Sequence, residues 1–204
     1  MEKTPFRLVE FGLSILYHAQ GDLSSQRNAR RFGKNHRKKA AFFSVIFLDI
    51  ARKKGYDKDW IHQRILSIRV RNELTSEWQQ NGIEKGHEYA ILTDEITKAW
   101  SGMSTRGYKN LKGLTKENLR DNMSTTELML NMLAETSTTD ISKEEHPQGL
   151  SENIKVAKRG GNVAKIARQA LETETGKSAI THQNAAELNK VVVDLIEEVT
   201  EEKE

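Results

Sequence analysis

The residues of this sequence best suited to chemistry are cations. Residues 27–39 contain seven basic side chains and no acidic one. A lysine or arginine placed at a phosphate releases condensed counterions, so such a run suits a nucleic-acid backbone. A solvated basic loop would have the same composition. If the run binds DNA, the predicted contacts are Arg27, Arg30, Arg31, Arg37, Lys38 and Lys39.

A second group of cations is spaced as on a short helix. Arg106, Lys109 and Lys112 recur every three residues, with Asn110 between them. A recognition helix in the major groove carries such side chains. Most helical hairpins with exposed lysines bind no DNA, and residues 81–140 hold 7 basic and 9 acidic residues. These three residues are therefore predicted as the second nucleic-acid site, behind residues 27–39.

The segment around this second group has the spacing of a helix-turn-helix. Thr93 can cap a first helix that ends near Gly102, and Ser104 or Thr105 can cap a second helix that stops at Gly113. A helix, a three-residue turn with glycine and a second helix match that motif.

Little in the sequence indicates catalysis. There is no cysteine, which excludes a thiol nucleophile, a disulfide scaffold and a cysteine zinc site. The six histidines are scattered without metal-ligand spacing, and no GxSxG, HExxH or GxGxxG motif occurs. We expect no catalytic residue, no cofactor and no metal. The enzyme alternative is a nuclease that uses scattered carboxylates.

Helical patterns cover the middle of the chain. Residues 57–80 have helical periodicity, and Asn81-Gly82 suits the end of that helix. Ser124-Thr-Thr-Glu127 matches a capping box. The helix after it is predicted to be the central core helix, with Leu128, Met132 and Leu133 buried. Residues 136–142 are predicted to be a polar connection.

The C-terminal third is predicted as loop and two helices. Residues 143–161, with Gly160 and Gly161, indicate a loop around a short helix at residues 151–158. An amphipathic helix then runs to Gly176. Its predicted inward face is Val163, Ile166, Ala167, Ala170 and Leu171. A last helix is predicted at residues 185–199, with the apolar stripe Leu188, Val192, Leu195 and Val199.

Composition supports a helical, water-exposed protein. Of 204 residues, 30% are charged and only two are proline, and no run of 18 apolar residues could span a bilayer. We expect a mainly all-α, multi-helix globular domain with helical hairpins and little or no strand. Residues 1–80 carry 16 basic and 8 acidic residues, a net charge of +8. The cysteine count is compatible with a reducing cytoplasm, which is the predicted location.

Several segments from about residue 48 onward resemble a bacterial and prophage family. They include GYDKDWIHQR (55–64), RNELTSEW (71–78), EYAILTDEI (88–96), YKNLKGL (108–114) and ENLRDNM (117–123). These segments are similar to the region that follows a BRO-type N-terminal domain in phage antirepressor-like proteins. They are also similar to the C-terminal half of DNA-damage-inducible protein D. No recognisable BRO domain precedes them.

The resemblance implies a non-enzymatic protein of prophage antirepressor or DNA-damage (SOS) response type. It would bind DNA without strong sequence preference, or bind a DNA-processing or repressor protein. The alternative is a docking or oligomerisation module without nucleic-acid contact, and a homo-oligomer is compatible with both. The expected domains are a divergent basic segment at 1–47, a remnant of a lost DNA-binding domain, then a helical core at 48–142. A helical extension with an acidic tail follows at 143–204.

Overall fold

A computed structural model of the chain describes residue 56 and residues 58–184. The chain divides into two units, Met1–Ile61 and His62–Glu204, and each is considered by itself. The basic run at residues 27–39 and the predicted last helix at residues 185–199 lie outside the described residues. The arrangement given below is that of the second unit.

Within the described range, the chain forms five α-helices, one short 3-10 helix and no strand. This confirms the all-α prediction. None of these helices is long and apolar enough to cross a membrane. The elements are α3 (Lys58–Gln80), α4 (His87–Ser101), α5 (Thr105–Leu111), the 3-10 helix η1 (Leu119–Asn122), α6 (Thr125–Glu145) and α7 (Gly149–Thr175).

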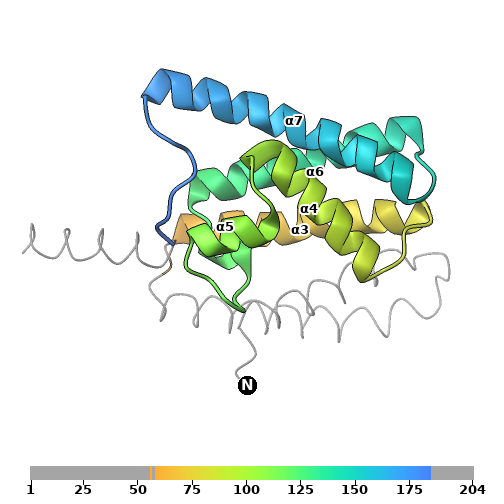
Figure 1. Ribbon diagram of the computed structural model, residues 1–204, viewed down its shortest axis with the longest axis horizontal. Helices are drawn as coiled ribbons and strands as arrows, with labels where there is room; N and C mark the ends of the chain where they lie inside the picture. The colour runs from red at the N-terminus through yellow and green to blue at the C-terminus, as the bar shows by residue number, and fades with distance from the viewer. Residues whose placement is uncertain (1–55, 57, 185–204) are drawn as a thin grey trace, which may run out of the picture. The chain divides into compact units, whose positions relative to one another are not determined.

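The longest of the described helices, α7, packs along both α4 and α6 (Figure 1). A hydrogen bond also links α6 to the end of α3. The side-chain amide of Asn81, just after α3, donates to Ser142 Oγ of α6 at 2.8 Å. Asn153 of α7 completes this junction, because its amide donates to the Gly149 carbonyl at 2.9 Å and its oxygen accepts from Asn81 at 3.5 Å. Residues 149–175 therefore belong to the same helical unit as α4 and α6.

The core is built from large side chains of α3, α4 and α6. Trp78, Trp100, Leu92 and Leu128 are all fully buried. The prediction for Leu128 is thus confirmed, and the Ser124–Glu127 capping box is present.

The predictions for Met132 and Leu133 are wrong. Met132 is only partly buried and Leu133 is 37% exposed. The inward face of α6 carries polar residues instead, and all of them except Asn131 have a side-chain hydrogen bond there. These buried polar residues are Glu127, Asn131, Glu135, Thr138, Thr139 and Ser142.

Two predicted helix boundaries are also wrong, and both involve threonine. Residues 136–142 continue α6, and Thr93 lies inside α4 instead of capping it. The hydroxyls of Thr138 and Thr93 donate to carbonyls four residues earlier, at 2.7 Å and 2.6 Å. A hydroxyl satisfied in this way lets threonine remain within a helix.

The Gly160-Gly161 pair lies in the middle of α7, not in a loop as predicted. A Cβ atom on Gly160 would lie 2.5 Å and 2.6 Å from the backbone N and Cα of Thr138 in α6. A Cβ on Gly161 would lie 2.5 Å from Ala99 Cβ in α4. The two glycines thus let α7 approach both neighbouring helices closely, at the conformational cost that glycine carries in a helix.

Candidate nucleic-acid interface

The predicted helix-turn-helix spacing is present in α4 and α5. The turn between them is Gly102–Ser104, and Gly102 has the left-handed φ of 81° that a helix end requires. Ser104 caps α5 by accepting from Gly107 N at 3.0 Å. The hairpin is therefore a three-residue connection with a defined cap at each end.

Asp94 of α4 fixes the first turn of α5. Its Oδ1 accepts from the backbone N of Thr105 at 2.7 Å, and its Oδ2 lies 2.8 Å from Lys98 Nζ. Partial burial alone would raise its pKa, but hydrogen bonds from Lys98 and Thr105 hold the pKa of Asp94 below its ordinary value. A carboxylate thus stands where a recognition helix presents its base-contacting turn, so the hairpin is poorly suited to base readout.

The three predicted cations of this hairpin have different surroundings. Arg106 is exposed and Lys109 is half-buried, and both belong to α5. Lys112 cannot reach a DNA phosphate, because its side chain has no exposed surface. Its Nζ lies 2.6 Å from Glu127 Oε2 and 2.6 Å from the carbonyl oxygen of Gln183. Burying a charge requires a partner of this kind, so the role of Lys112 is structural.

Lys112 and Glu127 together fasten the segment that follows α7. The other Glu127 oxygen, Oε1, accepts from Thr181 N at 2.9 Å. Burial, and then the charge of Glu127, raises the pKa of the neighbouring Tyr108 hydroxyl, which stays protonated. This buried corner therefore connects α5, the start of α6 and residues 181–183.

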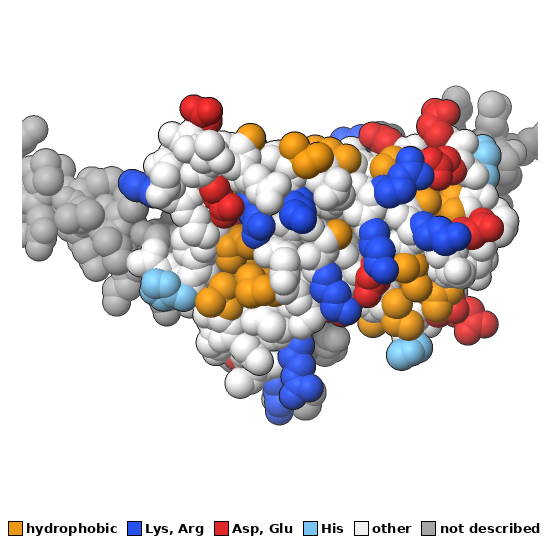
Figure 2. Space-filling view, turned by 45° about the horizontal axis from the view of Figure 1, so that its top comes forward, with side chains coloured by type: hydrophobic (Ala, Val, Ile, Leu, Met, Phe, Trp, Pro, Cys, Tyr) orange, Lys and Arg blue, Asp and Glu red, His pale blue; other side chains and the backbone are white. Residues whose placement is uncertain are grey.

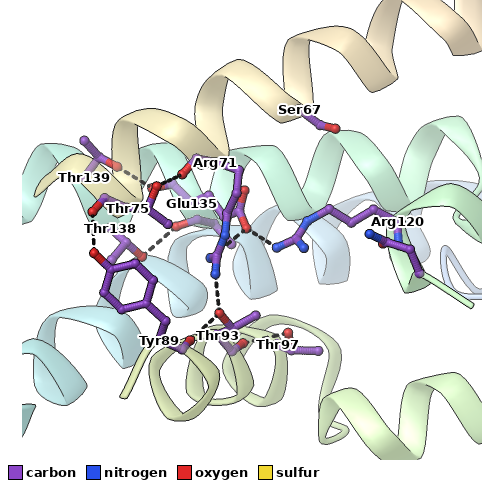
Figure 3. Close-up of polar contacts among 12 residues, drawn as sticks. Ser67, Arg71, Thr75, Tyr89, Thr93, Thr97, Arg120, Glu135, Thr138 and Thr139 are labelled. Atoms are coloured by element: carbon purple, nitrogen blue, oxygen red, sulfur yellow. Dashed lines mark hydrogen bonds and ion pairs between the residues drawn. The ribbon is translucent and has the colours of Figure 1, made fainter. Parts of the chain in front are cut away.

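A second buried charge cluster lies between α3, α4, η1 and α6 (Figure 3). Glu135 Oε1 accepts from Arg120 Nη2 and lies 3.4 Å from Arg71 Nη1. Arg71 also donates to Thr93 Oγ1 at 2.6 Å and lies over the Trp78 ring at 4.8 Å. The two guanidiniums share one carboxylate and hold four elements together, so this cluster positions the helices.

Acidic side chains do not assemble into a metal site in the described part of the chain. No group of three or more His, Cys, Asp or Glu residues there could hold a metal ion. The carboxylates of Glu127 and Glu135 are each bonded to cations.

Residues 61–191 of this chain match the family model of the DinD C-terminal domain. The chain belongs to the DinD C-terminal domain family. The matched range holds nearly all of the described helices and most of the segments that resembled DNA-damage-inducible protein D. This places the chain in a DNA-damage-inducible protein family. No curated protein and no solved structure matches the chain.

One cation of the DinD C-terminal domain was missed by the sequence reasoning. Lys165 of α7 is exposed and lies one turn before Arg168, whose Nη1 donates to the Ser101 carbonyl at 2.8 Å. Ser101 directly precedes the α4–α5 turn, so the turn of α7 that carries Lys165 lies beside the end of α4 that leads into α5. We call Arg106, Lys109 and Lys165 the basic edge.

Lysine and arginine side chains are spread over the face of the molecule that Figure 2 shows. Among the described residues, no ion pair links any of the three side chains of the basic edge to an acid. The sequence does mark the region of Lys165 as basic, because residues 155–171 hold five basic and no acidic residues. The expected loop at Gly160-Gly161 had divided this run in two.

Proposed function

We propose that this protein acts by binding the phosphate backbone of duplex DNA, without catalysing a reaction on it. The single observation that carries the proposal is the basic edge, whose cations on α5 and α7 are exposed or half-buried and have no ion pair to an acid among the described residues. Membership of a DNA-damage-inducible family supports the choice of DNA as the polyanion in this proposal. Each cation placed at a phosphate releases counterions, which supplies affinity for any sequence.

Sequence tolerance follows from the shape and charge of the hairpin. α5 has only seven residues. The amides of its first turn are bonded to Asp94 and Ser104. Phosphate contacts position a protein on DNA but carry no sequence information. The proposed binding is therefore weak and similar on unrelated duplexes.

The run at residues 27–39 stays a prediction for additional phosphate contacts. It lies outside the described residues. A fourfold variant, R30Q/R31Q/K38Q/K39Q, would measure its share independently of the basic edge.

The proposal is tested by fluorescence anisotropy on two unrelated duplexes. The variant R106Q/K109Q/K165Q removes the basic edge. A matched control, R69Q/K85Q/K177Q, removes the same charge from exposed positions elsewhere. We expect the first variant to lose affinity equally on both duplexes, while the control stays near wild type. Equal losses in both variants would show that only net charge matters, and no wild-type binding at about 50 mM salt would contradict direct DNA binding.

The second candidate function is docking to a protein partner without nucleic-acid contact. The observation that favours it is the exposure of large apolar side chains on α7, where Ile166 is 60% exposed. A folded domain that keeps such residues on one helix face often uses them as an interface. Binding of the full chain to a partner, with no DNA retention, would favour this reading.

A further inference from the structure

The outward face of α7 carries apolar residues that the bundle leaves uncovered. Val163 is 42% exposed, Ile166 is 60% exposed, and Ala170 is also exposed. Their spacing of three and four residues puts them on one side of the helix. The opposite side, with Gly161 and Ala164, is buried against the neighbouring helices. This corrects the prediction that Val163, Ile166, Ala170 and Leu171 face the core; Leu171 is 40% exposed.

Two cations continue this face towards the start of α7. Lys155 and Arg159 precede Val163 by eight and four residues, so they lie on the same side of the helix. Arg159 Nη1 lies 2.6 Å from Glu145 Oε1, and both side chains are about half exposed. We call Lys155, Arg159, Val163, Ile166 and Ala170 the outer strip. Along α7, the strip is first basic and then apolar.

The C-terminal segment of the chain has the complementary chemistry. Residues 185–204 contain seven acidic and two basic residues, a net charge of −5. Their apolar stripe, Leu188, Val192, Leu195 and Val199, comes first, and acidic residues such as Glu197, Glu201 and Glu202 predominate afterwards. This order, apolar and then acidic, matches the outer strip when the two segments run antiparallel.

The described chain ends on a different side of the unit from the outer strip. The Gln183 carbonyl is bonded to Lys112 and Thr181 N is bonded to Glu127, both at the corner of α5 and α6. Figure 1 shows residues 176–184 leading away from the end of α7. The described chain thus ends at the corner of α5 and α6, away from the outward face of α7. A second copy is free of this restraint.

We propose that the outer strip binds residues 185–204 of a second copy of this chain, with the two segments antiparallel. The apolar stripe covers Val163, Ile166 and Ala170, while the acidic residues pair with Lys155 and Arg159. Exchange in both directions gives a closed two-fold dimer, because each copy offers the same strip and the same segment. Opposite charges on the two surfaces favour this pairing and disfavour strip against strip.

Mixed-isotope cross-linking of the full chain tests the identity of the partner. Unlabelled and ¹⁵N-labelled chains are mixed and treated with a carbodiimide, and mass spectrometry identifies amide bonds between Lys155 and carboxylates of residues 185–204. We expect heavy–light cross-linked peptides in the proportion given by random mixing. Cross-links found only within one isotope would place the segment on its own chain and overturn the proposal. The absence of any cross-link from Lys155 to this segment would also overturn it.

The apolar half of the strip is tested by sedimentation analysis. I166D places a charge in the proposed contact at an exposed position, so the fold should be retained, which circular dichroism and a denaturant melt verify. Each two-fold dimer loses the burial of two isoleucines, one on each strip, so dimerisation should weaken by about a hundredfold or more. The control Q79D adds the same charge at an exposed position of α3 and should leave dimerisation unchanged. A wild-type chain that is monomeric at all concentrations, or an I166D chain that dimerises as well as Q79D, would overturn the proposal.

Discussion

Replacing Gly160 by alanine sets two physical effects against each other. Helix propensity alone favours alanine over glycine by about 1 kcal/mol in a helix interior. Packing opposes the change, because the new Cβ would lie 2.5 Å and 2.6 Å from backbone atoms of Thr138. Carbon atoms in contact are normally about 3.5–4.0 Å apart. Either α6 or α7 must therefore move by about 1 Å.

The expected result is a net loss of stability. Overpacking a close contact typically costs about 1–3 kcal/mol, and backbone atoms yield less easily than a side-chain end. After the gain in propensity, we expect G160A to lose about 1–2 kcal/mol in urea melts. Truncating Thr138 to alanine should rescue little of this loss, because the Thr138 backbone atoms remain in place.

A matched control separates packing from propensity. Gly107 lies within α5, and a Cβ there would meet Ser104 Oγ at 3.3 Å and Met103 Cβ at 3.8 Å. G107A should therefore be neutral or more stable than wild type, by up to about 1 kcal/mol. A G160A protein that gained stability as G107A does would refute the close approach of α7 to α6.

Three further predictions concern buried groups and one hydrogen-bonded carboxylate. L128A should cost about 2–5 kcal/mol in urea melts, since Leu128 is fully buried. M129A at the neighbouring, 52% exposed position should cost less than about 1 kcal/mol; equal losses would show that the burial pattern of α6 is wrong. K112A leaves the Glu127 carboxylate buried without its ammonium partner, so we expect the free energy of unfolding to fall by about 3–5 kcal/mol. A near-wild-type melt would show that the pair is not buried. Asp94 has a depressed folded pKa, so its contribution to stability is present above about pH 4 and is lost as the pH falls through the folded pKa. D94N should then be less stable than wild type at pH 7, and the difference should shrink as the pH falls through the folded pKa, in melts at a series of pH values; a pH-independent difference would show that the charge of Asp94 contributes nothing.

Local signals in the sequence predicted much of the helical framework. The Ser124–Glu127 capping box, the end of α3 before Gly82 and the cap at Ser104 are all present. Each depends on neighbouring residues alone, because a cap satisfies amides within its own first turn. The fold class followed from the same signals.

Features that depend on contacts between helices were not predictable in the same way. Gly160 and Gly161 have the composition of a turn, and only the nearness of Thr138 and Ala99 explains them inside a helix. The orientation of α6 also depends on distant partners. Its hydrophobic residues suggested that Leu133 faces the core, whereas buried Glu135 occupies the inward face because Arg71 and Arg120 lie there.

The candidate DNA-binding residues also divide into those that local spacing identifies and those whose position depends on contacts between distant residues. Spacing identified Arg106 and Lys109, which are accessible on α5. Lys112 continues their three-residue pattern, but its burial depends on Glu127 and Gln183, which are far from it in sequence. Lys165 lies near the end of α4 only because α7 is one continuous helix.

The most direct test of the central claim is the dependence of DNA affinity on salt concentration. The slope of log affinity against log salt measures how many phosphates the protein neutralises, at about 0.9 per contact on duplex DNA. If the basic edge contacts the backbone, R106Q/K109Q/K165Q should flatten the wild-type slope by about 2.7, while R69Q/K85Q/K177Q leaves it unchanged. A slope that is the same in wild type and in both variants would contradict the account.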